Sequence, residues 1–262
     1  MRKKNIKRVT IKIGTSTLTY KNGKLNYKNI EILVRTIADL KNRDIDVILV
    51  TSGAIGVGMT RLMLEKKPNE ISKKQAIAAI GQLELMYTYN KLFREYNINI
   101  GQVLLTKDCV FDPKRKINVV NTINELLNYK VLPIVNENDT IAVDEIVFGD
   151  NDTLSAYVAD LSKSDLLLIL TDIDGLYDKN PREHSSAKQI SVVEEIDDHI
   201  KQMATDTNST CGTGGMITKL LAGEIVNDHG IDMVIANGEN TSIIFDVLDG
   251  KPVGTLFKAK KK

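Results

Sequence analysis

Short, nearly continuous apolar runs alternate along this chain with longer segments of helical periodicity. The run 46–50 (DVILV) is typical of a parallel strand that is covered on both faces. The segment 25–43 is typical of an amphipathic helix, because its apolar residues recur at a spacing of three or four. We expect strands near 8–13, 46–50, 100–105, 131–135, 165–170 and 232–236, and helices over 25–43, after 71, near 117–127, after 154 and after 215. This alternation predicts a three-layer α/β/α sandwich with a mainly parallel central sheet.

The carboxyl ends of the expected strands are where such a sheet binds ligands. Four polar segments fall there: Gly14, Ser52 with Gly53, the stretch that begins at Asn136, and Thr171 with Asp172. The stretch 136–155 (NENDTIAVDEIVFGDNDTLS) holds six acidic residues, and no Lys or Arg occurs between Lys130 and Lys163. Carboxylates and amides at this density indicate a site for a polar ligand or a metal–phosphate complex. A solvated loop whose Asp and Asn side chains cap turns explains the pattern equally well.

Three glycine-containing turns have features of a ligand site. Lys12 ends the first strand next to Gly14, where a nest of backbone N–H groups and the lysine charge suit a phosphate; an exposed strand lysine is the alternative. The segment 211–219 (CGTGGMITK) leads into a helix that carries a lysine, but it does not match GxxxxGK[ST]. The turn 51–58 (TSGAIGVG) matches neither GxGxxG nor GxSxG, which argues against a dinucleotide fingerprint and against a nucleophilic Ser52. For 211–219 the alternative is a helix start without a ligand, and for 51–58 it is a tight turn without a ligand.

Composition narrows the class of protein. With 262 residues, 42% of them hydrophobic and 26% charged, the chain can form one large α/β domain or two small lobes. A net charge of +1 gives no basic field for nucleic acid, and no apolar run approaches the roughly 20 residues of a membrane span. Two cysteines and three histidines, with no histidine in the candidate turns, give little support for a disulfide framework, a zinc site or a Ser/His hydrolase. We therefore expect a cytoplasmic protein.

Five segments together resemble the amino acid kinase family, and within it the members that phosphorylate glutamate. They are 9–19 (VTIKIGTSTLT), 47–59 (VILVTSGAIGVGM), 133–156 (PIVNENDTIAVDEIVFGDNDTLSA), 167–181 (LLILTDIDGLYDKNP) and 212–219 (GTGGMITK). Two departures stand out. Ile217 occupies a position of the loop 212–219 where the family often has a small polar residue. An isoleucine there changes the ligand contacts that the side chain can make and leaves the backbone contacts of the loop unchanged. Many relatives carry a further C-terminal PUA domain, whereas a chain of 262 residues resembles the short form.

The resemblance implies transfer of the γ-phosphoryl group of ATP to the γ-carboxylate of L-glutamate, the first step of proline synthesis. The implied catalytic set is Lys12, Asp152 and Lys219, with the two lysines on opposite sides of the phosphoryl group and Asp152 holding both. The implied substrate-binding set is Ser52, Gly53, Asn136, Asp139 and Asn151. The implied nucleotide-binding set is Lys12, Gly14, Thr171, Asp172, Thr213, Gly214, Gly215, Met216 and Lys219.

The same resemblance implies Mg²⁺ carried by the ATP phosphates without a protein metal site, proline as a feedback inhibitor, and a homo-dimer or tetramer. It also implies one domain over 1–262, in which about 1–164 forms the amino-acid lobe, about 165–257 forms the nucleotide lobe, and 258–262 is a basic tail. Two other functions remain open: a sister kinase acting on another carboxylate or on carbamate, and a non-catalytic sensor of amino acid or nucleotide. The joint presence of Lys12, Asp152 and Lys219 favours an enzyme.

Overall fold

One sheet runs through the part of the chain that the computed structural model describes, which comprises residues 5–20, 22–142, 151–181, 183–206 and 215–260. Eight strands of these residues lie in the order β3-β4-β2-β1-β5-β7-β8-β6. Their bounds are β1 Arg8–Ile13, β2 Asp46–Val50, β3 Ile100–Leu105, β4 Leu132–Glu137, β5 Leu166–Thr171, β6 Val192–Val193, β7 Asp232–Asn237 and β8 Thr255–Phe257. Every neighbouring pair is parallel except β7 with β8, which is antiparallel. The expected mainly parallel sheet is confirmed.

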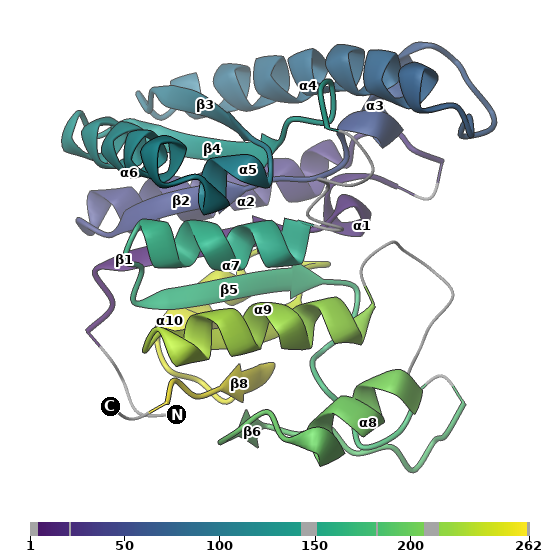
Figure 1. The fold of residues 1–262 in the computed structure, drawn as a ribbon, viewed down its shortest axis with the longest axis vertical. Helices are drawn as coiled ribbons and strands as arrows, with labels where there is room; N and C mark the ends of the chain where they lie inside the picture. Colours follow the sequence, from purple (N-terminus) through teal and green to yellow (C-terminus); the bar gives the residue numbers. More distant parts are fainter. Residues whose placement is uncertain (1–4, 21, 143–150, 182, 207–214, 261–262) are drawn as a thin grey trace.

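Helices cover both faces of this sheet, so the three-layer arrangement is also confirmed (Figure 1). In the described residues they are α1 Thr15–Leu18, α2 Tyr27–Asn42, α3 Ala54–Arg61, α4 Ile71–Arg94, α5 Asp108–Phe111, α6 Pro113–Asn128, α7 Asn151–Leu161, α8 Asp198–Asp206, α9 Met216–Asp228 and α10 Ile243–Leu248. In Figure 1, α6, α7 and α9 lie in front of the sheet, and α2 and α10 lie behind it. None of these helices is both long enough and apolar enough to cross a membrane.

Alternation of side chains along the strands explains why the apolar runs are nearly continuous. In β2, Val47 and Leu49 pack into one core cluster with α2, α4 and α10, whereas Ile48 packs into another with α6 and α7. In β5, Leu168 joins the first cluster and Ile169 packs with α7 and α9 on the opposite face. Because helices cover both faces of β2 and β5, the polar side chains of these two strands lie at the strand ends.

Several boundaries differ by a few residues from the expected ones, and two of these differences have local physical reasons. Helix α6 begins at Pro113 instead of near residue 117, because the Asp112 side chain accepts a hydrogen bond from the Arg115 backbone N–H and proline suits the first helical position. Strand β4 continues past residue 135 to Glu137, because Asn136 still pairs with β3. Asn136 is therefore a strand residue and not part of a loop.

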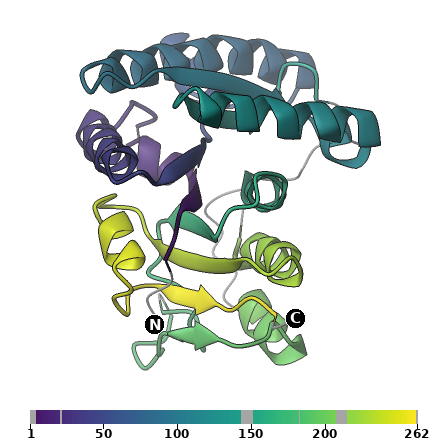
Figure 2. The same cartoon turned by 90° about the vertical axis from the view of Figure 1, so that its left-hand side faces the viewer.

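The sheet consists of two halves that meet between β1 and β5. Strands β3, β4, β2 and β1 come from the first part of the chain, and β5, β7, β8 and β6 come from the second (Figure 2). Helix α7 lies over this junction, since it contacts β1 and β5 in the sheet and packs beside α9. The first residues of α7 therefore lie at the carboxyl ends of strands from both halves.

Candidate active site

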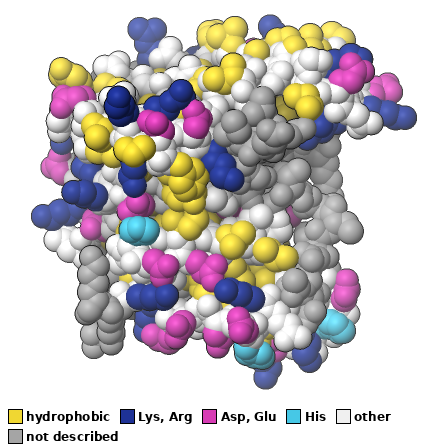
Figure 3. Space-filling view, in the orientation of Figure 1, with side chains coloured by type: hydrophobic (Ala, Val, Ile, Leu, Met, Phe, Trp, Pro, Cys, Tyr) yellow, Lys and Arg dark blue, Asp and Glu magenta, His cyan; other side chains and the backbone are white. Residues whose placement is uncertain are grey.

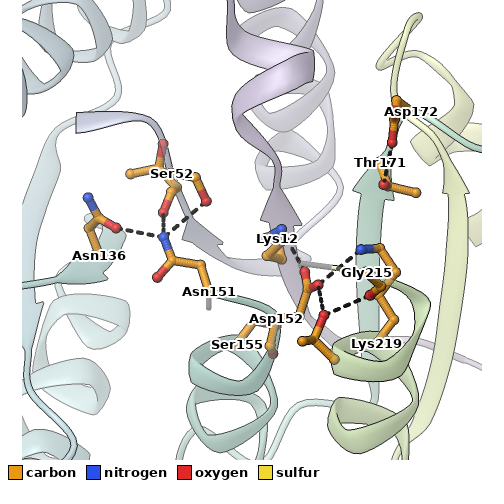
Figure 4. Close-up of polar contacts among 12 residues, drawn as sticks. Lys12, Ser52, Asn136, Asn151, Asp152, Ser155, Thr171, Asp172, Gly215 and Lys219 are labelled. Carbon is orange, nitrogen blue, oxygen red and sulfur yellow. Dashed lines mark hydrogen bonds and ion pairs between the residues drawn. The ribbon is translucent and has the colours of Figure 1, made fainter. Parts of the chain in front are cut away.

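Three charged side chains from three different elements meet near the carboxyl end of β1. Lys12 projects from β1, Asp152 from the first turn of α7, and Lys219 from the first turn of α9. Lys12 Nζ lies 2.6 Å from Asp152 Oδ1, and Lys219 Nζ lies 3.1 Å from Asp152 Oδ2 (Figure 4). All three residues are buried, Asp152 completely. We call these three residues the charged cluster.

Electrostatics keep the carboxyl group of the charged cluster ionised. Burial by itself would raise the pKa of Asp152, but the ammonium groups of Lys12 and Lys219 outweigh burial and lower that pKa. The carboxylate and the two ammonium groups together carry a formal charge of +1. A buried site with one surplus positive charge attracts an anion, and two ammonium groups can donate hydrogen bonds to the same phosphoryl group.

Thr218 is a further polar contact of Asp152, and sequence reasoning missed it. Its hydroxyl lies 3.1 Å from Asp152 Oδ2 and 2.8 Å from the carbonyl oxygen of Gly215, the residue that precedes α9. The side chain thus ties the start of α9 to the carboxylate that Lys219 also contacts. The sequence signal is weak, because Thr218 is simply the polar neighbour of the lysine.

A network of amide and hydroxyl groups lies beside the charged cluster. Asn151, the first residue of α7, directs Nδ2 towards three oxygens that share its two hydrogens: the Thr51 carbonyl at 2.8 Å, Asn136 Oδ1 at 2.9 Å and Ser52 Oγ at 3.0 Å (Figure 4). Asn136 Oδ1 also accepts a hydrogen bond from the backbone N–H of Glu137 at 2.9 Å. The structure therefore brings together the predicted residues Ser52, Asn136 and Asn151, which lie on three different elements.

A buried pair of hydroxyl groups links the turn after β2 to helix α4. The Thr51 hydroxyl lies 3.0 Å from the hydroxyl of Tyr89 on α4, and both residues are almost fully buried. Gly53 then adopts φ +92°, a left-handed conformation that favours glycine, and α3 begins at the next residue. This geometry keeps Ser52 next to Asn151. Tyr89 is the second contact that the sequence did not disclose, since it reads as one more apolar position of a long helix.

Asp139 stands apart from the amide network. It is half-buried, and within the described residues no hydrogen bond links its side chain to Ser52, Asn136 or Asn151. Burial raises the pKa of Asp139, although the charge of Lys67 acts in the opposite direction. The acidic residues Asp144, Glu145 and Asp150 of the same stretch lie outside the described residues.

The residues expected to border the nucleotide lie on the other side of Lys12. Thr171 ends β5, the strand paired with β1, and its hydroxyl lies 3.2 Å from a carboxylate oxygen of Asp172. The Gly14 backbone N–H donates to the carbonyl oxygen of Leu170 at 3.2 Å, so the turn after β1 is joined to the same strand. Met216 begins α9 directly after Gly215, whereas Thr213 and Gly214 lie outside the described residues. The Ile217 side chain is partly exposed at 39%.

Comparison with known proteins decides what kind of site this is. The model of the amino acid kinase family matches residues 7–237. The chain belongs to the amino acid kinase family. A glutamate 5-kinase of Clostridium perfringens (strain 13 / Type A) is 51% identical over 98% of this chain and 97% of its own length, and one of Thermoanaerobacter sp. (strain X514) is 51% identical over 97% of this chain and 68% of its own length. The carbamate kinase from Giardia lamblia bound to AMP-PNP has the same fold, with a TM-score of 0.69 at 19% identity over 98% of this chain and 99% of its own.

The side chains of the site determine whether the protein itself could bind a metal ion. The described residues contain no group of three or more His, Cys, Asp and Glu side chains that could hold a metal ion. The buried carboxylate of the charged cluster has both oxygens within ion-pair distance of an ammonium group. The two ammonium groups of the cluster are suited to contact with anionic oxygens.

Proposed function

We propose that this amino acid kinase transfers the γ-phosphoryl group of ATP to the γ-carboxylate of L-glutamate and forms L-glutamyl 5-phosphate, the first step of proline synthesis. The charged cluster carries the proposal, because it sets two ammonium groups beside an amide-lined region at the carboxyl ends of the strands. The glutamate 5-kinases that match nearly the whole chain at about half identity support the same acceptor.

In this reaction an oxygen of the γ-carboxylate forms a bond to the γ-phosphorus while the bond from that phosphorus to the β–γ bridging oxygen breaks and ADP leaves. A glutamate side chain has a pKa of about 4.3 and is ionised at neutral pH, so the acceptor needs no general base. What the reaction requires is alignment and neutralisation of charge on the transferred group. Lys12 and Lys219 supply that charge from two sides, and Asp152 acts as a positioning residue that holds both lysines.

The amino acid itself would lie against the amide network. Ser52 and Asn151, with the left-handed turn at Gly53, present polar groups to the carboxylate end of glutamate. Asp139 with the neighbouring Asn136 supplies the partner for the α-ammonium group. For Asp139 this role requires the charged form, although burial raises its pKa.

The nucleotide would lie on the opposite side of the charged cluster, between the end of β5 and the start of α9. Gly14, Thr171 and Asp172 would border it from the sheet, and Gly215 and Met216 would border it from the start of α9. For Thr213 and Gly214, which lie outside the described residues, a nucleotide contact is proposed from the family resemblance alone. Mg²⁺ would be held by the ATP phosphates and would supply charge neutralisation there. The engagement of both Asp152 oxygens by lysines supports this assignment.

Trapping of the acyl phosphate tests the proposal directly. With Mg-ATP and hydroxylamine, the wild-type chain should release ADP and form hydroxamate only when L-glutamate is present. Aspartate, N-acetylglutamate and carbamate serve as alternative acceptors, because a pocket built from few residues sets specificity. Turnover with one of them and not with glutamate would assign a sister kinase activity. Nucleotide binding without any turnover would indicate a sensor.

Proline inhibition belongs to the same proposal, since proline shares the five-carbon skeleton and the α-carboxylate of glutamate and would occupy part of the amino-acid site. Glutamate saturation curves should shift to higher concentration when proline is added. Curves that coincide with and without proline would remove this part of the proposal.

We also propose a homo-oligomer, a dimer or tetramer, formed in the cytoplasm from chains that each hold the amino-acid lobe up to about residue 164 and the nucleotide lobe after it. Support comes from an exposed apolar stripe on α4, where Ile80, Leu83 and Tyr87 are 37%, 74% and 63% exposed. Figure 3 shows hydrophobic side chains gathered along the upper edge of the molecule, where α4 runs. Light scattering that gives a 29.1 kDa particle at micromolar concentration would contradict this assembly.

A further inference from the structure

Gln82 on α4 is a buried amide that touches the candidate substrate site and that the mechanism above does not use. Its side-chain oxygen Oε1 accepts a hydrogen bond from Asn136 Nδ2 at 2.8 Å. The residue is only 8% exposed, and its nitrogen Nε2 is buried without a hydrogen-bond partner among the residues that the structure describes. A buried amide nitrogen in this state needs an explanation, because most buried donors in proteins are satisfied.

Backbone groups fix which way these amides point. The Glu137 N–H can only donate, so the Asn136 atom that it faces at 2.9 Å is the oxygen Oδ1. Asn136 therefore presents Nδ2, a donor, to Gln82. Gln82 therefore accepts this hydrogen bond with Oε1, and Nε2 with its two hydrogens is left to donate to another acceptor.

Close helix packing holds Gln82 at this place. A Cβ added to the preceding residue, Gly81, would lie 1.8 Å from the Ala54 carbonyl oxygen and 2.5 Å from the Gly58 nitrogen. Helices α3 and α4 thus touch backbone to backbone, directly after the turn that carries Ser52. This glycine contact fixes the α4 backbone beside Gln82, whose Oε1 bonds to Asn136 of the amide network.

We propose that Gln82 is a specificity-determining residue whose Nε2 donates a hydrogen bond to an oxygen of the bound amino-acid substrate. The inference rests on the proposed function, because it takes an oxygen of the bound amino acid as the acceptor that the described residues do not supply. Gln82 then has two separate tasks: Oε1 orients Asn136, and Nε2 binds substrate.

Two substitutions of similar length separate these tasks. Gln82→Glu keeps an acceptor for Asn136 and replaces the donor by an anionic oxygen, whereas Gln82→Met removes both. If Nε2 contacts a substrate oxygen, the glutamate KM should rise about 100-fold or more in Gln82→Glu and about 10-fold in Gln82→Met, with the ATP KM and kcat within about fivefold of wild type. If Gln82 only supports Asn136, the order reverses, and Gln82→Glu is the milder change.

The acidity of the reaction mixture gives a second readout. A buried glutamic acid at position 82 gains a proton more readily than an exposed one, and its neutral form can donate a hydrogen bond. The ratio of glutamate KM values, Gln82→Glu over wild type, should therefore fall between pH 8 and pH 6, while the ratio for Gln82→Met stays constant. Thermal unfolding measures whether each variant is folded. If Gln82→Glu does not fold, Gln82→Met alone decides: a glutamate KM within twofold of wild type overturns the inference.

The outcomes separate this inference from the proposed function. A wild-type chain that turns over glutamate, with Gln82→Glu milder than Gln82→Met, overturns only the role of Gln82. A wild-type chain that forms no hydroxamate from glutamate removes both.

Discussion

Replacing Asp152 by Asn should lower the stability and the rate together, because this one carboxylate neutralises two buried ammonium groups. Its oxygens lie 2.6 Å and 3.1 Å from Lys12 Nζ and Lys219 Nζ, and the residue has no exposed surface. Removing one partner of a buried ion pair costs about 3–5 kcal/mol. At roughly 2–4 °C per kcal/mol for a chain of this size, Tm should fall by about 10 °C. The lysines lose their alignment, so kcat should fall by about 10²–10³, the scale of one preorganised electrostatic contact.

Thermal unfolding and hydroxamate formation measure the two effects of this substitution. Asp46→Asn is the matched control: Asp46 pairs with Arg8 at 2.9 Å, but both side chains are partly exposed, so its loss should cost less than about 1 kcal/mol and leave kcat unchanged. Because the pKa of Asp152 is lowered in the folded state, its stabilising contribution is fully present above the unfolded pKa of about 3.9 and is lost as pH falls through the folded value. The unfolding curves of wild type and Asp152→Asn should therefore converge only at strongly acidic pH. An Asp152→Asn variant with a Tm within 2 °C of wild type and more than about a third of its kcat would refute this reasoning.

Three further predictions concern the surroundings of the charged cluster. Gly81→Ala should destabilise the chain by about 2 kcal/mol or more in denaturant unfolding, because the added Cβ would lie 1.8 Å from the Ala54 carbonyl oxygen; unchanged stability would mean that α3 and α4 can separate without cost. Tyr89→Phe should cost about 1–2 kcal/mol and raise the glutamate KM, since it leaves the buried Thr51 hydroxyl without its partner; a neutral substitution would show that the turn holds itself. The glutamate KM of wild type should rise on acidification at a pH above the ordinary aspartate pKa of about 3.9, because burial raises the pKa of Asp139 and its charged form is needed; Asp139→Asn should have a high KM without this pH dependence, and parallel profiles would exclude the role.

The layered fold could be predicted because strand and helix periodicities differ strongly in this chain. Strand β3 runs from Ile100 to Leu105 as expected, and the continuous run in β2 reflects burial on both faces. The antiparallel strand β8 and the two-residue strand β6 could not be predicted, since segments this short carry no periodicity.

The candidate site was predictable only where a residue stands at the end of a strand or the start of a helix. Lys12, Asp152 and Lys219 all stand at such positions, and the structure brings each lysine within ion-pair distance of Asp152. Tyr89 and Gln82 were not predictable, because they lie in the interior of a 24-residue helix and meet the site only through tertiary packing. Single-sequence patterns report which face a residue occupies and not which residue lies opposite.

The central claim is that two lysines held by one carboxylate transfer a phosphoryl group to glutamate. Hydroxamate formation from L-glutamate and Mg-ATP, compared between wild type and Lys219→Met, tests it most directly, since methionine keeps most of the unbranched side chain and removes the ammonium group. The account predicts glutamate-dependent hydroxamate in wild type and a loss of about 10²-fold or more in a variant that stays folded. Equal hydroxamate formation by the two proteins would contradict it.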